Sequence, residues 1–225
     1  MKKLIGAFAL TLALAPASLA QESALEFDGY VGLASDFRDR GLSLSAKDPV
    51  FVASVGAFHE NGLYGGIVGA YLGEDGIGDA KAEFYAGYQM DRGDYIYDFS
   101  VELDSYHGDT SKYFPEFKAT VARDFGLAFI RGGAAYSPDG RWSDPDRDSF
   151  YLYTDLEVPV PNMPELTIIS RLGYDMRQDR TNVWDWGIGV SVFINQIELS
   201  VMYEDSGRDS DMGTGAIVAG ARFYF

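Results

Sequence analysis

The residues with the clearest potential for catalysis gather around one of the two histidines of this 225-residue chain. His107 follows Asp104 and Ser105 and precedes Asp109, and these are the residue types that a serine hydrolase uses. His59 stands beside a predicted tight turn, at the end of the molecule opposite to His107. Polar residues also gather at strand ends without any catalysis. The sequence therefore predicts that the chain is not an enzyme. A hydrolase centred on His107 stays open as an alternative.

A possible metal loop lies further along the chain. Asp144-Pro-Asp-Arg-Asp148 has carboxylates at alternate positions, and Asp155 follows at the spacing of the last ligand of a calcium loop. However, Ser149 stands where such a loop needs glycine for its sharp turn, and Tyr151–Asp155 has the pattern of a strand. We predict a solvated acidic loop, with no metal and no cofactor. Loose contact of this loop with divalent ions stays open.

Composition excludes several classes of chemistry. The chain has no cysteine, which removes disulfides, thiolate nucleophiles and cysteine metal sites. Its formal net charge is −16, and it becomes −18 if Lys2 and Lys3 are removed with a signal peptide. Such a charge disfavours nucleic acid as a partner and favours cations.

A signal peptide is indicated by the first twenty residues. Lys2 and Lys3 precede an apolar run over residues 4–15, and Ser18-Leu-Ala20 has small residues where a signal peptidase reads. We expect cleavage after Ala20, which divides the chain into a signal peptide at 1–20 and a single domain at 21–225. No later run is long and apolar enough for a membrane-spanning helix, so only a closed barrel of strands would cross a bilayer.

Strand-like segments recur along the rest of the chain and number about twelve. They cover residues 26–37, 49–59, 63–73, 79–91, 94–107, 112–124, 127–137, 149–158, 165–177, 184–194, 197–205 and 214–225. Tight turns such as Glu60-Asn-Gly62 and Asn195-Gln196 alternate with longer polar stretches such as 38–48 and 138–148. This rhythm is typical of short periplasmic turns and longer outer loops.

The strands also alternate in polarity. In 184–194 the face that begins with Trp184 is wholly apolar, and Asp185 begins the opposite face. Segments 94–107 and 149–158 alternate in the same way, whereas 63–73 has apolar residues on both faces and cannot be phased. The fold class is therefore all-β, a transmembrane up-and-down antiparallel barrel closed by pairing 26–37 with 214–225. The chain ends on Phe225, which we interpret as a signal to the barrel-assembly machinery.

On this phasing many acids face the lumen, and they outnumber the bases by about two to one. Rings of Asp and Glu are one way in which pores favour cations. Residues on neighbouring strands near mid-height are the candidates for the pore lining: Glu102, Asp104, Glu116, Lys118, Arg131, Asp155, Glu157 and Arg171. A network of salt bridges that fills the barrel and only stabilises it is the alternative.

One motif carries a resemblance to a known family. Ser35-Asp-Phe-Arg-Asp-Arg-Gly-Leu-Ser-Leu-Ser45 with Pro49 resembles the opening motif of the TorF-like family of putative outer-membrane porins. The matching residues are Ser35, Asp36, Phe37, Arg38, Arg40, Gly41, Ser43 and Pro49. The resemblance implies an outer-membrane barrel that acts as a channel, without naming a solute. Asp39 departs from the family, where an apolar or aromatic residue is more usual, and is expected to make the first outer loop more polar.

These observations predict an outer-membrane porin for passive diffusion of small, cationic or neutral solutes. A non-conducting structural or adhesive barrel is the second alternative, and a lipid-acting enzyme at His107 is the third. The expected partners are outer-membrane lipid, lipopolysaccharide, the barrel-assembly machinery and small solutes. The oligomeric state is left open.

Overall fold

A computed structural model describes residues 24–225 except 74, 77, 108–111, 139 and 143. The predicted signal peptide at 1–20 lies outside the described residues. Within them, no helix has the length and apolar character that crossing a membrane requires.

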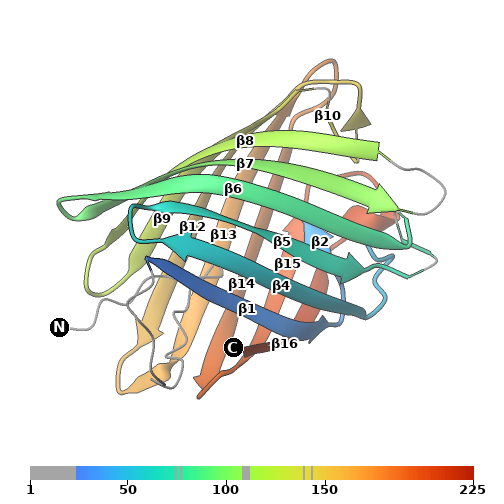
Figure 1. Cartoon of the computed structure of the whole chain (residues 1–225). Coiled ribbons are helices and arrows are strands. Elements are labelled where there is room, and N and C mark those ends of the chain that lie inside the picture. The colour runs from blue at the N-terminus through green and yellow to red at the C-terminus, as the bar shows by residue number, and fades with distance from the viewer. Residues whose placement is uncertain (1–23, 74, 77, 108–111, 139, 143) are drawn as a thin grey trace.

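Twelve antiparallel strands form one closed barrel, which confirms the predicted fold class (Figure 1). In chain order they are β1 (Leu25–Ala34), β4 (Val50–His59), β5 (Leu63–Tyr71), β6 (Ala80–Arg92), β7 (Tyr95–His107), β8 (Lys112–Asp124), β9 (Phe129–Ser137), β12 (Ser149–Val160), β13 (Met163–Arg177), β14 (Val183–Ile194), β15 (Ile197–Ser206) and β16 (Ala216–Tyr224). Two small hairpins and a short 3-10 helix lie in the connections: β2 (Arg38–Asp39) with β3 (Leu42–Ser43), β10 (Gly140–Arg141) with β11 (Asp144–Pro145), and η1 (Asp211–Gly213).

The first and last strands close the barrel, as predicted. β1 pairs with β16 from Tyr30↔Tyr224 to Ala34↔Gly220. The terminal residue continues this ladder, because Phe225 and Gly29 exchange two backbone hydrogen bonds of 3.0 and 3.1 Å. β1 begins and β16 ends at the end of the barrel that carries the short turns, such as the turn at Asn195 and Gln196. We call this the tight-turn end and the other the long-loop end.

The predicted faces are confirmed on the strands that could be phased. Trp184, Trp186 and Ile188 on β14 are exposed on the outside, whereas Asp185 is 3% exposed on the inside. Apolar side chains similarly cover the outer faces of β7 and β12. An apolar exterior with polar groups inside is the arrangement of a barrel that stands in lipid.

Strand β5, which could not be phased from the sequence, is apolar on both faces for a physical reason. Val68 lies within β5 and Leu72 directly follows it. Both point inward and pack in a hydrophobic cluster inside the barrel. Leu44 from the first long connection, with no exposed surface, and Trp142 from the β10–β11 hairpin belong to the same cluster. Both faces of this part of β5 are therefore apolar because one meets lipid and the other meets inserted loops.

Several predicted strand ends differ from the structure. The first strand was expected to reach residue 37, but β1 ends at Ala34, where the chain leaves the wall and turns inward. The predicted segments 149–158 and 165–177 left residues 159–164 outside the strands, but Pro159 and Pro164 lie inside β12 and β13. The turn itself consists of residues 161 and 162, with Asn162 at φ 65°.

Candidate pore and its loop plug

The first long connection folds into the barrel rather than over its outer surface. β2 and β3 form a hairpin whose two turn residues, Arg40 and Gly41, both have a positive φ of 49° and 71°. Two positive φ angles give a turn that matches the twist of a hairpin, and glycine accommodates this conformation most easily. A Cβ on Gly41 would lie 2.6 Å from Cβ of Ser206, so the wall also approaches this turn closely. In Figure 1, β2 and β10 lie toward the end of the barrel where β5 and β7 end.

Asp36 organises this connection from within. Its carboxylate accepts hydrogen bonds from Ser43 Oγ at 2.5 Å and Ser45 Oγ at 3.1 Å, and from Arg38 Nη1 at 3.1 Å. Arg38 also donates to the carbonyl oxygens of Gly41 at 2.7 Å and Thr214 at 2.9 Å. The motif residues therefore build a compact inserted loop, and we call residues 35–48 together with the hairpin 140–145 the loop plug.

Glu116 on β8 fastens the loop plug to the wall. Its side chain is 3% exposed. Its carboxylate forms salt bridges with Arg40 Nη2 and Arg141 Nη1, each at 2.5 Å, and the two arginines come from different parts of the plug. Lys118 Nζ at 3.2 Å and Ser137 Oγ at 2.6 Å complete its surroundings. A buried carboxylate needs such partners, because an unpaired buried charge costs several kcal/mol.

Asp39 joins the two parts of the plug to each other. It accepts hydrogen bonds from the Arg141 guanidinium and from Trp142 Nε1 at 3.2 Å. Burial alone would raise the pKa of the Asp39 carboxyl, but the cations of Arg141, Arg40 and Lys81 outweigh burial and hold this pKa well below its usual value. The family departure at Asp39 was expected to make an outer loop more polar. This expectation is wrong about the place, because Asp39 lies inside, where it binds two loops together.

The predicted pore-lining residues all lie on inward faces, and most of them are brought together. Lys118 Nζ lies 2.5 Å from Glu102 Oε2, and Arg171 Nε lies 2.7 Å from Asp155 Oδ1. Asp104 instead joins the plug region, where Lys81 Nζ is 3.0 Å away and Arg141 3.7 Å. Arg131 stands beside Asp155 in the register, and Glu157 pairs in register with Phe129 and Ile169.

Sequence reasoning missed the arginines that the connections bring to the inner acids. Arg38 lies 3.9 Å from Glu204, and Arg208 lies 3.0 Å from Asp175. With Arg40 and Arg141 this makes four cations from outside the wall strands. The one signal was the Arg40-Gly41 pair, which favours a hairpin turn but does not say that the hairpin enters the barrel.

The hydrolase candidate at His107 and the calcium-loop candidate at residues 144–155 are only partly assembled. Ser105 Oγ and His107 Nε2 lie 2.9 Å apart, but Ser105 is 2% exposed, and Asp104 points to the plug on the other face of β7. Asp109 lies outside the described residues. Asp155, the last residue of the supposed calcium loop, faces the lumen and forms a salt bridge with Arg171 at 2.7 Å.

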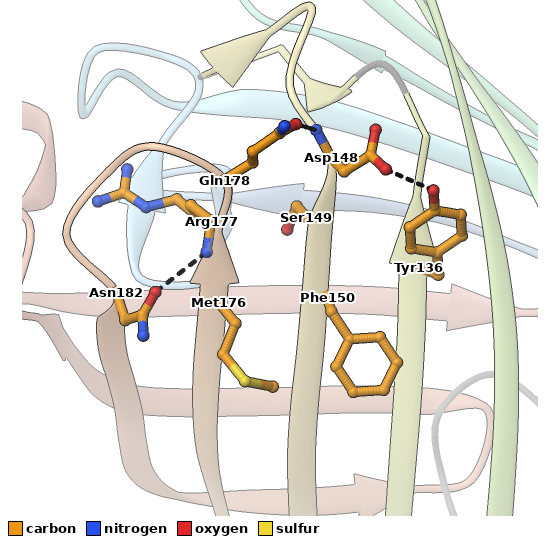
Figure 2. Close-up of a pocket in the computed structure, with 8 residues that line it drawn as sticks. All are labelled: Tyr136, Asp148, Ser149, Phe150, Met176, Arg177, Gln178 and Asn182. Atoms are coloured by element: carbon orange, nitrogen blue, oxygen red, sulfur yellow. Dashed lines mark hydrogen bonds between the residues drawn. The ribbon is translucent and has the colours of Figure 1, made fainter.

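A shallow pocket of about 320 Å³ opens at the rim of the long-loop end, between β9, β12 and β13. Figure 2 shows its apolar floor of Phe150 and Met176. Above them, Asp148 accepts a 2.6 Å hydrogen bond from Tyr136 and donates its backbone N–H to Gln178 at 3.3 Å. The described residues that line the pocket do not belong to the loop plug.

Comparison with known proteins supports the architecture. A family model described as a bacterial protein of unknown function (Gcw_chp) matches residues 19–223. No curated protein matches the sequence. Among solved structures, the KdgM porin in complex with disordered oligogalacturonate is similar, with a TM-score of 0.59, 9% identity and coverage of 89% of this chain and 99% of that one. The NanC porin gives a TM-score of 0.54, 10% identity and coverage of 88% and 98%. At such identities the likeness concerns the fold, which is that of outer-membrane porins.

Proposed function

We propose that this chain, which belongs to the Gcw_chp family of bacterial proteins of unknown function, is an outer-membrane channel for passive diffusion of small solutes. The observation that carries the proposal is a closed barrel of twelve strands with an apolar outer face and a charged inner face. Stability alone does not require a charged interior. Replacing buried salt bridges with well-packed apolar residues is often neutral or stabilising. The TorF-like resemblance of the loop plug points to the same role.

The proposed orientation places the tight-turn end in the periplasm, with the long-loop end outside. Barrels of this kind have short periplasmic turns and longer outer loops, and an even number of strands leaves both chain ends on the periplasmic side. Export through a cleaved signal peptide at 1–20 and insertion by the barrel-assembly machinery belong to this proposal. Outer-membrane lipid and lipopolysaccharide would then surround the apolar outer face.

The loop plug would narrow the channel at its outer end. Solutes would pass beside the loop plug, then along the wall between the plug and the tight-turn end. Twelve strands enclose a lumen between the filled barrels of about eight strands and the open porins of sixteen or more. A plug in a lumen of this size selects small solutes.

The charge of the lumen supports cationic or neutral solutes. The four arginines from the connections reduce the excess of acids, but carboxylates remain the majority of the inward-facing charged groups. Asp28 and Asp98 add acids on walls away from the plug. Excess negative charge in a narrow space raises the local concentration of cations. The oligogalacturonate of the KdgM complex belongs to that protein, and sugar acids are a class to test here rather than the expected solute.

Single-channel current of the purified, refolded protein in a planar bilayer tests the proposal. Discrete current steps with a reversal potential on the cation-selective side are expected under a salt gradient. Anion selectivity would contradict the charge argument. A silent bilayer that contains folded barrel would support the second candidate, a non-conducting structural barrel, which the burial of Leu44 and Glu116 in the plug favours.

A lipid-acting enzyme is the third candidate, and the 2.9 Å contact between Ser105 and His107 is the observation behind it. We propose that this contact is structural, because Ser105 is too deeply buried to reach a lipid ester. Lipid hydrolysis by the purified barrel that is lost in His107→Ala would overturn this assignment.

A further inference from the structure

Arg131 on β9 is a lumen-facing arginine that forms no salt bridge within 4 Å among the described residues, although its charge acts on Asp98 of β7. Its register neighbours are Ala122 on β8 and Asp155 on β12. Asp155 is already bound by Arg171 at 2.7 Å, and the guanidinium of Arg131 instead lies over the ring of Phe129, 5.6 Å from its centre. Within the part of the chain that the structure describes, no carboxylate pairs with Arg131. Arginine is the side chain best suited to bind a carboxylate of a solute.

Two cations on nearby strands, Lys118 on β8 and Arg171 on β13, also face the lumen. In the Arg171–Asp155 pair the arginine side chain is 30% exposed and the aspartate 11%. Lys118 is 24% exposed, whereas its partners Glu102 and Glu116 are 18% and 3% exposed. In each of these pairs the cation is more exposed than the acid. A solute that slides along β8, β9, β12 and β13 therefore meets positive charge first, although acids are the majority in the lumen as a whole.

The opposite wall carries an acid without a cation. β1 and β9 are six places apart in the ring of twelve strands, so they face each other across the barrel. Asp28 lies near the start of β1, as Arg131 lies near the start of β9, and both positions are close to the tight-turn end. Asp28 lies close to Gly56, on the lumen side, near the Tyr85 hydroxyl, and no described cation pairs with it.

We propose that the lumen between Arg131 and Asp28 selects zwitterions, small net-neutral solutes that carry both a carboxylate and an ammonium group. The inference rests on the proposed channel function and names its solute class. The carboxylate of the solute contacts Arg131, with Arg171 and Lys118 on nearby strands, and the ammonium group points toward the wall of Asp28. A transverse field of this kind orients a dipolar solute, whereas an uncharged solute gains nothing from it.

Swelling of liposomes that contain the purified full-length barrel tests this selectivity. The probes are glutamine, a zwitterion, and ribitol, an uncharged polyol of similar size, each supplied outside at equal osmolarity. We expect glutamine to enter faster than ribitol. In Arg131→Gln the ratio of the two rates should fall by about two- to fivefold, the effect of losing one partly exposed charge contact. Asp28→Asn should lower the ratio in the same direction.

Arg123→Gln is the matched control, because Arg123 pairs with Asp94 at 3.0 Å beside Tyr95, on the outer side of the barrel. It removes the same charge from the molecule and should leave the ratio unchanged. A native ratio of one, or a ratio that Arg131→Gln does not change, would overturn the inference while the channel still conducts. Failure of the channel itself is a different result, since neither solute would then enter and no single-channel current would appear.

Discussion

Arg40 Nη2 lies 2.5 Å from Glu116 Oε2, and this contact joins the tip of the first inserted hairpin to the inner face of β8. The guanidinium of Arg40 also lies over the ring of Tyr151, 4.0 Å from its centre, so the same side chain rests on β12. The hairpin is thus held by two strands of the wall. Because Glu116 also receives Arg141, a single carboxylate holds both parts of the loop plug in place.

Replacing Glu116 by glutamine should loosen the plug. The change takes from Arg40 the buried carboxylate that it contacts and removes one of the carboxylates around Arg141, which costs about 3 kcal/mol or more. We expect a larger single-channel conductance and more frequent transitions between current levels in Glu116→Gln. Glu60→Gln, on the exposed turn at the opposite end, is the control for charge. Identical conductance in the two variants would show that the plug does not restrict the pore.

The pair of Asp39 with Arg141 makes the plug sensitive to acid. The pKa of Asp39 is held below its ordinary value of about 3.9, so folding of the plug favours the ionised carboxylate. The stabilisation is fully present above that ordinary value and is lost as the pH falls toward the lowered pKa of the folded state. Conductance of the native channel should therefore rise only below about pH 4.

Asp39→Asn isolates this group from the other carboxylates. The variant should have a raised conductance already at neutral pH, with a smaller further rise on acidification. Conductance recorded from pH 7 to pH 3 in both proteins provides the comparison. If the two profiles are parallel, another carboxylate controls the acid response.

The wall could be predicted from the sequence because its pattern is local. Along β14, the alternation of Trp184, Trp186 and Ile188 with Asp185 assigns each side chain to lipid or lumen without reference to any other strand. The closing pair of β1 with β16 also follows, since a closed barrel leaves no other partner for the two end strands.

The loop plug could not be predicted because its contacts are not local. Arg40 and Glu116 are 76 positions apart, and Arg141 and Asp39 are 102 apart. A polar connection with charged residues has the same pattern outside the barrel as inside it. The apolar inner face of β5 was the one trace of the plug in the wall, and it was indistinguishable from a strand of uncertain phase.

Two adjacent glycines in β9 should respond oppositely to alanine. A Cβ on Gly133 would lie 2.3 Å from the ring of Tyr153, which covers this glycine from the neighbouring strand, whereas a Cβ on Gly132 would meet nothing within 4 Å. Gly133→Ala must displace the ring and should cost about 1–3 kcal/mol of unfolding free energy. Gly132→Ala should be neutral or slightly stabilising, by less than about 1 kcal/mol. Urea unfolding in lipid vesicles measures both, and equal stabilities would mean that Tyr153 does not lie on Gly133.

Phe225 combines two roles that one pair of variants separates. Its backbone exchanges two hydrogen bonds with Gly29, and its ring lies against the same glycine, where a Cβ would be 2.8 Å away. Deletion of Phe225 removes both the ladder pair and the ring, and Phe225→Ala removes the ring alone. If the assembly machinery recognises the ring, both variants should yield less folded barrel in the outer membrane of cells.

Refolding of the purified chain in detergent should be impaired mainly by the deletion, because only the deletion opens the seam between β1 and β16. The folded fraction is measured by the mobility of unheated and heated samples on a gel. Full recovery of Phe225→Ala from the outer membrane would show that closure of the barrel depends on the backbone of this residue and that its aromatic ring is not an assembly signal.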